Sequence, residues 1–220
     1  LNLKKETLKH FRIKNDIEVI PNFIDMNLYS NKSEDNLRNK IASKKEKILI
    51  HISNFRKVKR IEDVILIYNK VQKKVPAKLL MIGDGPERLK AERLCRDLGI
   101  WNKVQFMGKL KSVEQFLSIS DVFLLPSETE SFGLVALEAM ASGTPVVSSN
   151  SGGLPEINVD SETGFMADVA DIETMSEKTI SLLSDEQMLS SFKENSYKHA
   201  KSYDLPKILP LYEALYSKLI

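Results

Sequence analysis

Short, almost continuously apolar runs alternate with amphipathic segments along much of the chain, and this alternation restricts the fold more than any other feature. Runs of this kind are typical of parallel strands that are buried on both faces. The alternation predicts an α/β fold with a doubly wound parallel, Rossmann-like sheet. The predicted strands are Ile17–Ile20, Ile48–Ile52, Lys78–Ile82, Val104–Met107, Val122–Leu125 and Val146–Ser148. The helices between them are predicted at Arg60–Val75, Glu87–Leu98, Val113–Ser118 and Phe132–Ala141.

The pattern changes after Ser149, and the two ends of the chain read differently from the middle. We predict residues 1–16 to be helical and separate from the sheet, and residues 30–46 to include a surface helix. The remaining expectations are a tight turn opening a short helix at Ser151–Glu156, a turn into a short strand at Glu162–Phe165, and helices near Ile172–Leu183, Asp185–Ser202 and Leu205–Leu219.

The composition excludes several classes of protein. Of the 220 residues, 42% are hydrophobic and 28% are charged, which is typical of a folded globular chain. No run approaches the roughly 18 apolar residues of a membrane helix, so we expect no integral membrane segment. The single cysteine, Cys95, excludes a disulfide framework and favours a cytoplasmic location. Because the chain begins with Leu1 rather than methionine, we interpret it as part of a longer chain.

The charge is unevenly distributed, although the formal net charge is only +2. Residues 1–60 hold 15 Lys and Arg against 7 Asp and Glu, a net charge of +8, and residues 61–220 hold 17 against 23, a net charge of −6. Aromatic residues do not interleave with the cations, which argues against nucleic acid as a partner. Two interpretations stay open: a solvated surface, or a local anion site around Arg56, Lys57, Lys59 and Arg60.

The segment from Glu128 to Pro145 carries the clearest chemical signal. It follows a predicted strand that ends at Leu125, so its polar groups lie at the carboxyl end of a parallel strand, where open α/β sheets bind ligands. The free N–H groups at residues 131–134, where a helix begins, suit a phosphate or sugar oxygen. Gly133 allows a ligand to approach the backbone closely.

Two carboxylates frame this segment. Glu130 lies in the predicted loop, and Glu138 lies about two turns into the predicted helix, so roughly 12 Å separate them. Paired hydrolytic carboxylates lie about 5–9.5 Å apart, so this pair is too widely spaced for that chemistry. The spacing suits the two ends of an extended ligand, such as the hexose and ribose of a nucleotide sugar. Acids favoured by the helix dipole are the alternative.

Together these motifs resemble the retaining glycosyltransferases of the GT4 type, which have the GT-B fold. The motifs are Glu130-x7-Glu138 with Ser131-Phe132-Gly133-Leu134 inside it, Val19-Ile20-Pro21-Asn22-Phe23-Ile24-Asp25, Gly83-Asp84-Gly85-Pro86, Val104-x-Phe106-x-Gly108 and Gly143-Thr144-Pro145-Val146-Val147. The resemblance covers residues 17–203 almost continuously. The run Leu49–Arg60 is most similar to one subgroup, the N-acetylglucosaminyl L-malate synthases that start bacillithiol biosynthesis.

The resemblance implies that the chain is the C-terminal, donor-binding half of a two-domain enzyme. Residues 17–203 would form the nucleotide-sugar-binding domain, residues 1–16 a remnant of the N-terminal domain or of the crossover segment, and residues 204–220 a helix that packs back toward the N-terminal domain. The partners implied are a UDP-sugar, with N-acetylglucosamine as the expected sugar, and a small acceptor such as L-malate. The acceptor would be bound mainly by the N-terminal domain. A homo-oligomer is left open.

The resemblance also assigns roles to individual residues. In the family, an Arg and a Lys five residues apart hold the diphosphate; here that register falls on Asn54 and Lys59, so Lys59 matches and Asn54 departs. Arg56 is a candidate for the missing cation. Lys59 and Glu130 are the predicted catalytic residues. The full predicted donor site is Ser53, Asn54, Arg56, Lys59, Gly108, Lys109, Leu110, Glu130, Ser131, Phe132, Gly133, Leu134 and Glu138, with Gly108–Leu110 at the uracil, Glu130 at the donor sugar and Glu138 at the ribose.

No cofactor or metal is expected, because the chain lacks an Asp-x-Asp pair that could hold a metal diphosphate. Gly83-x-Gly85 lacks the third glycine of a dinucleotide-binding motif, since Arg88 stands there. His51, at the end of a core strand, is interpreted as packed or hydrogen-bonded rather than catalytic. Two alternatives to a transferase stay open: a nucleotide-sugar epimerase of the same architecture, and a nucleotide-binding module that is inactive on its own.

Overall fold

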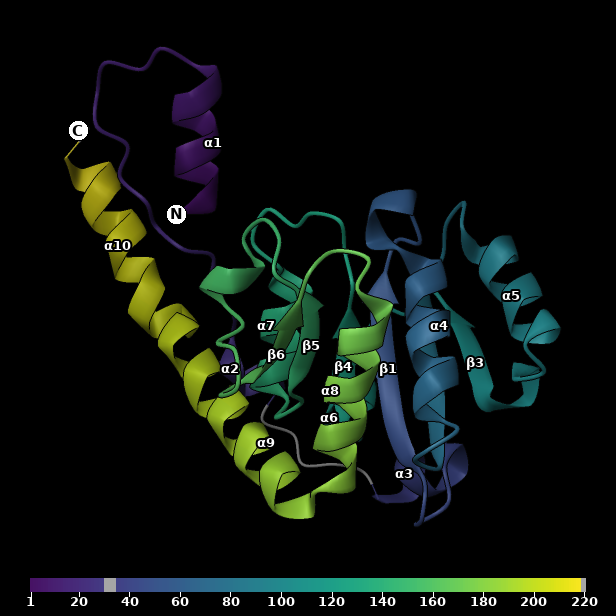
Figure 1. The fold of residues 1–220 in the computed structure, drawn as a ribbon. Helices are drawn as coiled ribbons and strands as arrows, with labels where there is room; N and C mark the ends of the chain where they lie inside the picture. Colours follow the sequence, from purple (N-terminus) through teal and green to yellow (C-terminus); the bar gives the residue numbers. More distant parts are fainter. Residues whose placement is uncertain (30–34, 219–220) are drawn as a thin grey trace.

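A computed structural model describes residues 1–29 and 35–218. These described residues form one parallel sheet with six strands in the order β3-β2-β1-β4-β5-β6 (Figure 1). From β1 to β3 the chain adds strands toward one edge of the sheet, and from β4 to β6 it adds them toward the other edge. This order confirms the predicted doubly wound α/β fold. The strands are β1 (Lys47–Ser53), β2 (Ala77–Gly83), β3 (Val104–Gly108), β4 (Val122–Leu125), β5 (Val146–Ser149) and β6 (Gly164–Ala167).

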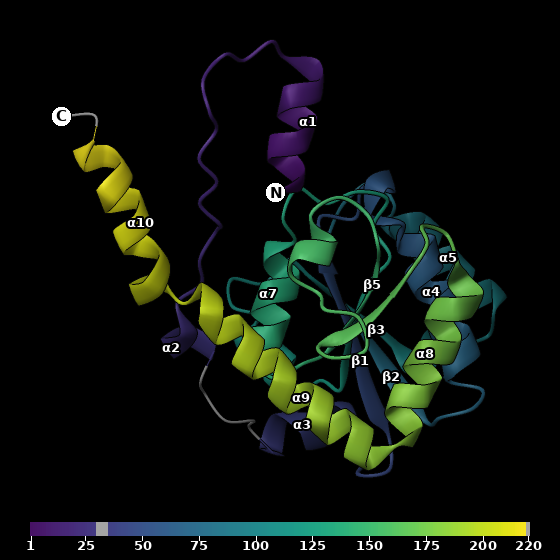
Figure 2. The ribbon, with the colours of Figure 1, turned by 60° about the vertical axis from the view of Figure 1, so that its left-hand side comes forward.

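Helices cover both faces of the sheet, with α4 and α8 on one face and α7 on the other (Figure 2). Alternate residues of each strand supply the two cores: Leu49 of β1 packs with the α4 side, whereas Ile48 and Ile50 pack with the α7 side. The α-helices are α1 (Asn2–His10), α2 (Met26–Tyr29), α3 (Asp35–Ile41), α4 (Ile61–Val71), α5 (Arg88–Asp97), α6 (Glu114–Ser118), α7 (Leu134–Ala141), α8 (Ile172–Ser184), α9 (Glu186–Ala200) and α10 (Leu205–Ser217). Short 3-10 helices lie at η1 (Lys57–Lys59), η2 (Trp101–Lys103), η3 (Leu154–Glu156) and η4 (Lys201–Tyr203).

Five of the six predicted strands are confirmed, and one is wrong. Ile17–Ile20 is an irregular segment, and the side chain of Val19 is 42% exposed. The first β-bridge of the chain is at Ile24, which pairs with Asp204 and whose N–H donates to the carbonyl of Tyr203 at 2.9 Å. Three apolar residues beside Glu18 were too weak a signal, because a strand also needs a neighbouring edge to pair with. The sixth strand is instead β6, which begins at Gly164, within the segment Glu162–Phe165 that was predicted as a turn into a short strand.

Two helices begin later than predicted because of backbone conformation at their starts. The helix predicted from Phe132 begins at Leu134, since Gly133 before it has φ +90°. The helix predicted from Arg60 begins at Ile61, since Arg60 is left-handed with φ +51°. The predicted surface helix within residues 30–46 is α3, and residues 30–34 lie outside the described residues. The last predicted helix is α10, and Leu219 also lies outside them.

The first and last helices extend away from the sheet (Figures 1 and 2). Every residue of α1 is at least partly exposed, and Ile208 is the buried residue of α10. Among the described residues, no helix combines the length and the hydropathy needed to cross a membrane.

Candidate functional site

The carboxyl ends of β1 and β4 mark the point where the strand order reverses, and this is where open α/β sheets bind ligands. Two loops leave the sheet there. We call residues 54–60, after β1, the first loop, and residues 126–133, after β4, the second loop. The sequence placed most of the candidate site on these two loops, and the structure brings them into contact. The N–H of Glu128 donates to the carbonyl of Val58 at 2.8 Å.

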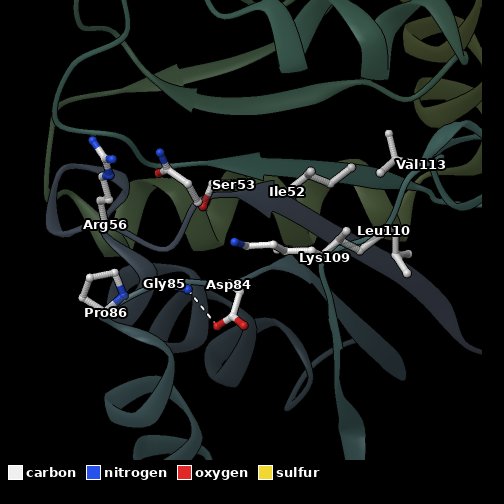
Figure 3. Close-up of a pocket in the computed structure, with 12 residues that line it drawn as sticks. Ile52, Ser53, Arg56, Asp84, Gly85, Pro86, Lys109, Leu110 and Val113 are labelled. Atoms are coloured by element: carbon white, nitrogen blue, oxygen red, sulfur yellow. Dashed lines mark hydrogen bonds between the residues drawn. The ribbon is translucent and has the colours of Figure 1, made fainter.

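A cleft of about 540 Å³ lies beside the first loop (Figure 3). One end is apolar, with Ile52, Leu110 and Val113, and Arg56 lies at the other end. Five predicted site residues line this cleft: Ser53, Asn54, Arg56, Lys109 and Leu110; the other lining residues are Ile52, Ile82, Gly83, Asp84, Gly85, Pro86 and Val113. The cleft therefore suits a ligand that is planar and apolar at one end and anionic at the other.

The Gly83–Pro86 turn supports the first loop by close backbone packing. A Cβ atom on Gly83 would lie 1.8 Å from the carbonyl oxygen of Ser53, and one on Gly85 would lie 2.1 Å from that of Asn54. Neither position has room for a side chain unless the first loop moves. These glycines therefore position the loop through contact with its backbone, which explains the motif without a role in binding phosphate.

Gly108 ends β3 with φ +67°, a conformation that glycine adopts without strain. The chain turns there, and the next two residues, Lys109 and Leu110, line the cleft. In Figure 3 the ammonium group of Lys109 points into the space between Ser53 and Asp84. Gly108 itself is not among the cleft-lining residues that the structure describes.

The two predicted catalytic residues form an ion pair across the two loops. The Nζ of Lys59 lies 2.6 Å from Oε1 of Glu130, and the Ser127 hydroxyl donates to the same oxygen at 2.8 Å. The Lys59 and Glu130 side chains are only 19% and 11% exposed. In a pair this sheltered from water, the attraction offsets the cost of desolvating the two charges only where further hydrogen bonds satisfy them, as the Ser127 hydroxyl does for Glu130. The pair places opposite charges side by side where the first loop meets the second loop.

A third segment, which the sequence predicted as a tight turn opening a short helix and which ends in η3, holds the second loop. The N–H of Gly153 donates to the carbonyl of Glu130 at 2.7 Å, and the Ser151 hydroxyl donates to that of Glu128 at 2.8 Å. A Cβ atom on Gly152 would lie 2.2 Å from the Glu130 carbonyl oxygen. The sequence signal for this support was the Gly152-Gly153 pair, which a close backbone approach requires.

The start of α7 carries the remaining predicted residues of the second loop. No side chain among the described residues caps this helix, so its first N–H groups are available to a ligand. Ser131 is exposed, and Leu134 is 44% exposed. Gly133 packs tightly, because a Cβ there would lie 2.7 Å from Leu154. The ring of Phe132 instead makes an edge contact with Tyr203, at 6.0 Å between centroids, so its role is packing.

Glu138 is not among the described residues that line the cleft; it lies in a half-buried cluster with Tyr29 of α2 and Glu114 of α6. Burial raises the pKa of Glu138, a hydrogen bond from Tyr29 lowers it, the charge of Glu114 raises it, and the net shift is upward. Sequence reasoning missed Tyr29 and Glu114, because nothing in the pattern linked these distant helices to Glu138. Among the described residues, no group of three or more His, Cys, Asp or Glu side chains could hold a metal ion.

Comparisons with known proteins agree with this geometry. The family model described as Glycosyl transferases group 1 matches residues 33–199. The chain belongs to this family. A curated relative among the group 1 glycosyltransferases, N-acetyl-alpha-D-glucosaminyl L-malate synthase of Bacillus anthracis, is 40% identical over 217 residues. The match covers 98% of this chain and 57% of that relative, so the chain spans little more than half of the relative's length.

Another group 1 relative, the D-inositol 3-phosphate glycosyltransferase of Corynebacterium urealyticum, is 38% identical over 141 residues, which are 60% of this chain and 33% of the relative. Among solved structures, sucrose-phosphate synthase of Thermosynechococcus elongatus superposes with a TM-score of 0.88 at 25% identity, over 99% of this chain and 56% of that one. Anabaena HepE, solved in complex with UDP and glucose, gives 0.86 at 24% identity, over 97% and 60%. The predicted family resemblance and the GT-B fold are thereby confirmed.

The family resemblance implies an arginine at position 54, where this chain has Asn54. Asn54 and Arg56 are both exposed and line the cleft, whereas Lys59 points to Glu130. The first loop therefore directs Arg56 to the cleft and Lys59 to the second loop. Whether Arg56 replaces the family's arginine stays a prediction.

Proposed function

We propose that this chain is the donor-binding half of a retaining glycosyltransferase that uses a UDP-sugar. The observation that carries the proposal is that the first loop borders the cleft and also contacts the second loop. It lines the cleft through Asn54 and Arg56, and it contacts the second loop through the Lys59–Glu130 pair. A single extended ligand could therefore run from the apolar end of the cleft, past the cations, to Glu130.

In this proposal, the uracil lies beside Gly108–Leu110 and the ribose hydroxyls bind Glu138. The diphosphate lies between Lys59, with Arg56 as the second cation, and the N-terminal N–H groups of α7. Helix N–H groups and cations aimed at a leaving phosphate stabilise the charge that develops in the transition state. Glu130 accepts a hydrogen bond from a hydroxyl of the donor sugar and orients it. Bound phosphate would draw Lys59 away from Glu130, which frees the carboxylate for the sugar.

The proposed transfer proceeds on one face of the sugar, through an oxocarbenium-like state. The bond between the sugar C1 and the phosphate oxygen breaks, the bond between C1 and the acceptor oxygen forms, and the leaving diphosphate takes the acceptor's proton. The products are the glycoside and UDP. The chain's residues bind and stabilise charge in this scheme, and neither a metal nor another cofactor takes part.

The proposed donor is UDP-N-acetylglucosamine and the proposed acceptor is L-malate. The name of the Bacillus anthracis relative supports both the sugar and the acceptor, and the UDP bound in the HepE structure supports the nucleotide. We further propose that the acceptor is bound mainly by a domain outside this chain, and that the enzyme acts in the cytoplasm, as the single Cys95 suggests.

The test is an assay of the full-length enzyme with UDP-N-acetylglucosamine, with and without L-malate. The proposal predicts UDP release that depends on malate, and a glycoside with the α-anomeric proton coupling of the donor in NMR spectra. Epimerised UDP-sugar without an acceptor would favour the epimerase instead. Titration of UDP into this 220-residue chain tests the donor half separately, and failure to bind at millimolar concentration would contradict the proposal.

A further inference from the structure

A buried histidine lies directly beneath the cleft and hydrogen-bonds through both ring nitrogens. His51 of β1 is fully buried. Its Nδ1 lies 2.8 Å from the carbonyl oxygen of Leu124 on β4, and its Nε2 lies 2.8 Å from the hydroxyl oxygen of Ser53. Ser53 is one of the cleft-lining residues. His51 therefore connects the end of β4 to a group that faces the ligand.

The partners of His51 determine which nitrogen carries the proton. A carbonyl oxygen only accepts hydrogen bonds, so Nδ1 must donate to Leu124. Burial and, to a lesser extent, the charge of Lys59 lower the pKa of His51, the hydrogen bond to Leu124 partly opposes them, and the net pKa is about 4. The ring is therefore neutral near pH 7, and Nε2 offers a lone pair. The Ser53 hydroxyl must donate its one proton to that lone pair.

The remaining capacity of the Ser53 hydroxyl follows by counting. A serine hydroxyl has one proton and two lone pairs. The proton is directed to His51, and one lone pair accepts the N–H of Phe55 at 3.2 Å. One lone pair is left for the cleft. Toward a ligand, Ser53 can therefore only accept a hydrogen bond.

This restriction discriminates between parts of a nucleotide. Ionised phosphate oxygens are acceptors, so they cannot bond to a hydroxyl that offers only a lone pair. A nucleoside carries donors, namely the ribose O–H groups and the uracil N–H. We propose that His51 acts as a positioning residue that turns the Ser53 hydroxyl into an obligate acceptor, so that Ser53 binds an O–H or N–H of the nucleoside and not the diphosphate. This inference rests on the proposed function.

The first experiment separates the two halves of the ligand. Binding of uridine, pyrophosphate and UDP is measured for the wild-type protein and for Ser53→Ala, with Ser217→Ala on α10 as the matched control. Losing one hydrogen bond should weaken uridine binding about 5-fold and UDP binding by a similar factor. Pyrophosphate binding should change less, and Ser217→Ala should match the wild type for all three probes.

The results distinguish this inference from the proposed function. If Ser53→Ala leaves uridine affinity unchanged, or weakens pyrophosphate binding more than uridine binding, the inference is overturned while UDP binding by the wild type still supports the proposed function. If the wild type binds no UDP, the proposed function fails and the inference fails with it. A uridine loss larger than the pyrophosphate loss supports the inference, and equal losses overturn it.

The second experiment tests His51 through its two nitrogens. The amide nitrogen of His51→Asn can occupy the Nδ1 position and donate to Leu124, but it cannot reach Ser53. The longer amide of His51→Gln reaches the Nε2 position and can accept from Ser53. We expect His51→Asn to lose uridine affinity about as much as Ser53→Ala, and His51→Gln to retain more of it. Equal uridine affinity in folded His51→Asn and wild type would overturn the positioning role.

Discussion

The two loops that meet at this edge of the sheet are each supported by a glycine-containing segment, but they differ in backbone conformation and in the exposure of their charged groups. In the first loop, Phe55 is fully buried with φ +40°, Arg60 has φ +51°, and the charged ends of Arg56 and Lys57 are left exposed. The second loop is fixed from outside by the 151–153 segment, and its acid, Glu130, is sheltered. Strained backbone that a structure maintains is common at functional sites.

The difference between the two loops suits them to two different tasks. A loop that fixes its backbone and exposes its cations can attract and bind an anion of variable position. A loop that shelters a carboxylate among hydrogen bonds keeps that carboxylate in one place. Lys59 is the residue in which the two meet, because it belongs to the first loop and pairs with the acid of the second.

The largest expected effect comes from breaking that connection. Lys59→Ala should lower the turnover number of the full-length enzyme by about 10²-fold or more, a loss of roughly 2.7 kcal/mol, because a cation aimed at a leaving phosphate acts mainly in the transition state. Steady-state kinetics measures this, and the donor Michaelis constant should change less. Lys57→Ala, an exposed neighbour, is the control. Near-normal turnover in Lys59→Ala combined with a large loss in Arg56→Ala would show that the phosphate site is centred on Arg56.

The support of the first loop should depend on pH through His51. Its pKa is lowered to about 4 from 6.5, so protonation favours the unfolded chain. The stabilisation is fully present above pH 6.5 and is lost as the pH falls toward 4. Between pH 7 and pH 5, His51 should account for about 2 kcal/mol of lost unfolding free energy. Urea unfolding of wild type and His51→Gln at both pH values tests this, since all other groups are shared; the same pH dependence in both proteins would contradict it.

The external support of the second loop can be tested by adding one methyl group. Gly152→Ala introduces a Cβ atom 2.2 Å from the Glu130 carbonyl oxygen, at φ +64°. Gly99→Ala is a matched control, because Gly99 has φ +70° and nothing within 4 Å of a Cβ atom. Both variants lose about 1–2 kcal/mol from the left-handed backbone. We expect Gly152→Ala to lose about 1.5 kcal/mol more in unfolding free energy, as an overpacked site does. Equal losses would mean that the 151–153 segment does not hold the loop.

The smallest expected effect is a gain in UDP affinity from a substitution at Asn54. Asn54→Arg restores the cation that the family pattern places at this position. Because Asn54 is exposed, the added charge should tighten UDP binding by only about 2- to 5-fold at low salt, and high salt should weaken the gain. Isothermal titration at two salt concentrations measures this. A gain that does not depend on salt would point to a rearranged loop rather than to an added charge.

The sequence predicted the sheet well because the pattern that indicates a buried strand is contained within the strand itself. Buried parallel strands such as Val122–Leu125 are recognisable from a few consecutive residues. Ile17–Ile20 has three β-branched apolar residues, although Glu18 interrupts them, and pairing depends on a partner edge that the run itself does not reveal. The start of α7 was missed by two residues because the φ of Gly133 is set by its packing against Leu154.

The sequence predicted where the site lies, but it did not predict which side chains contact one another there. Strand order places residues 54–60 and 126–133 at one edge, yet the contact between Lys59 and Glu130 depends on side-chain directions across 71 positions of sequence. Tyr29 beside Glu138 was missed for the same reason. Such contacts leave no periodic signal, since one residue of each pair lies in another element or under the surface.

The most direct test of the account is a crystal structure of this chain with UDP. The account predicts the uracil beside Lys109 and Leu110, a nucleoside O–H or N–H within hydrogen-bond distance of the Ser53 hydroxyl, and the diphosphate in contact with Lys59 and the first N–H groups of α7. A diphosphate bound away from both loops, or UDP on another face of the sheet, would contradict it.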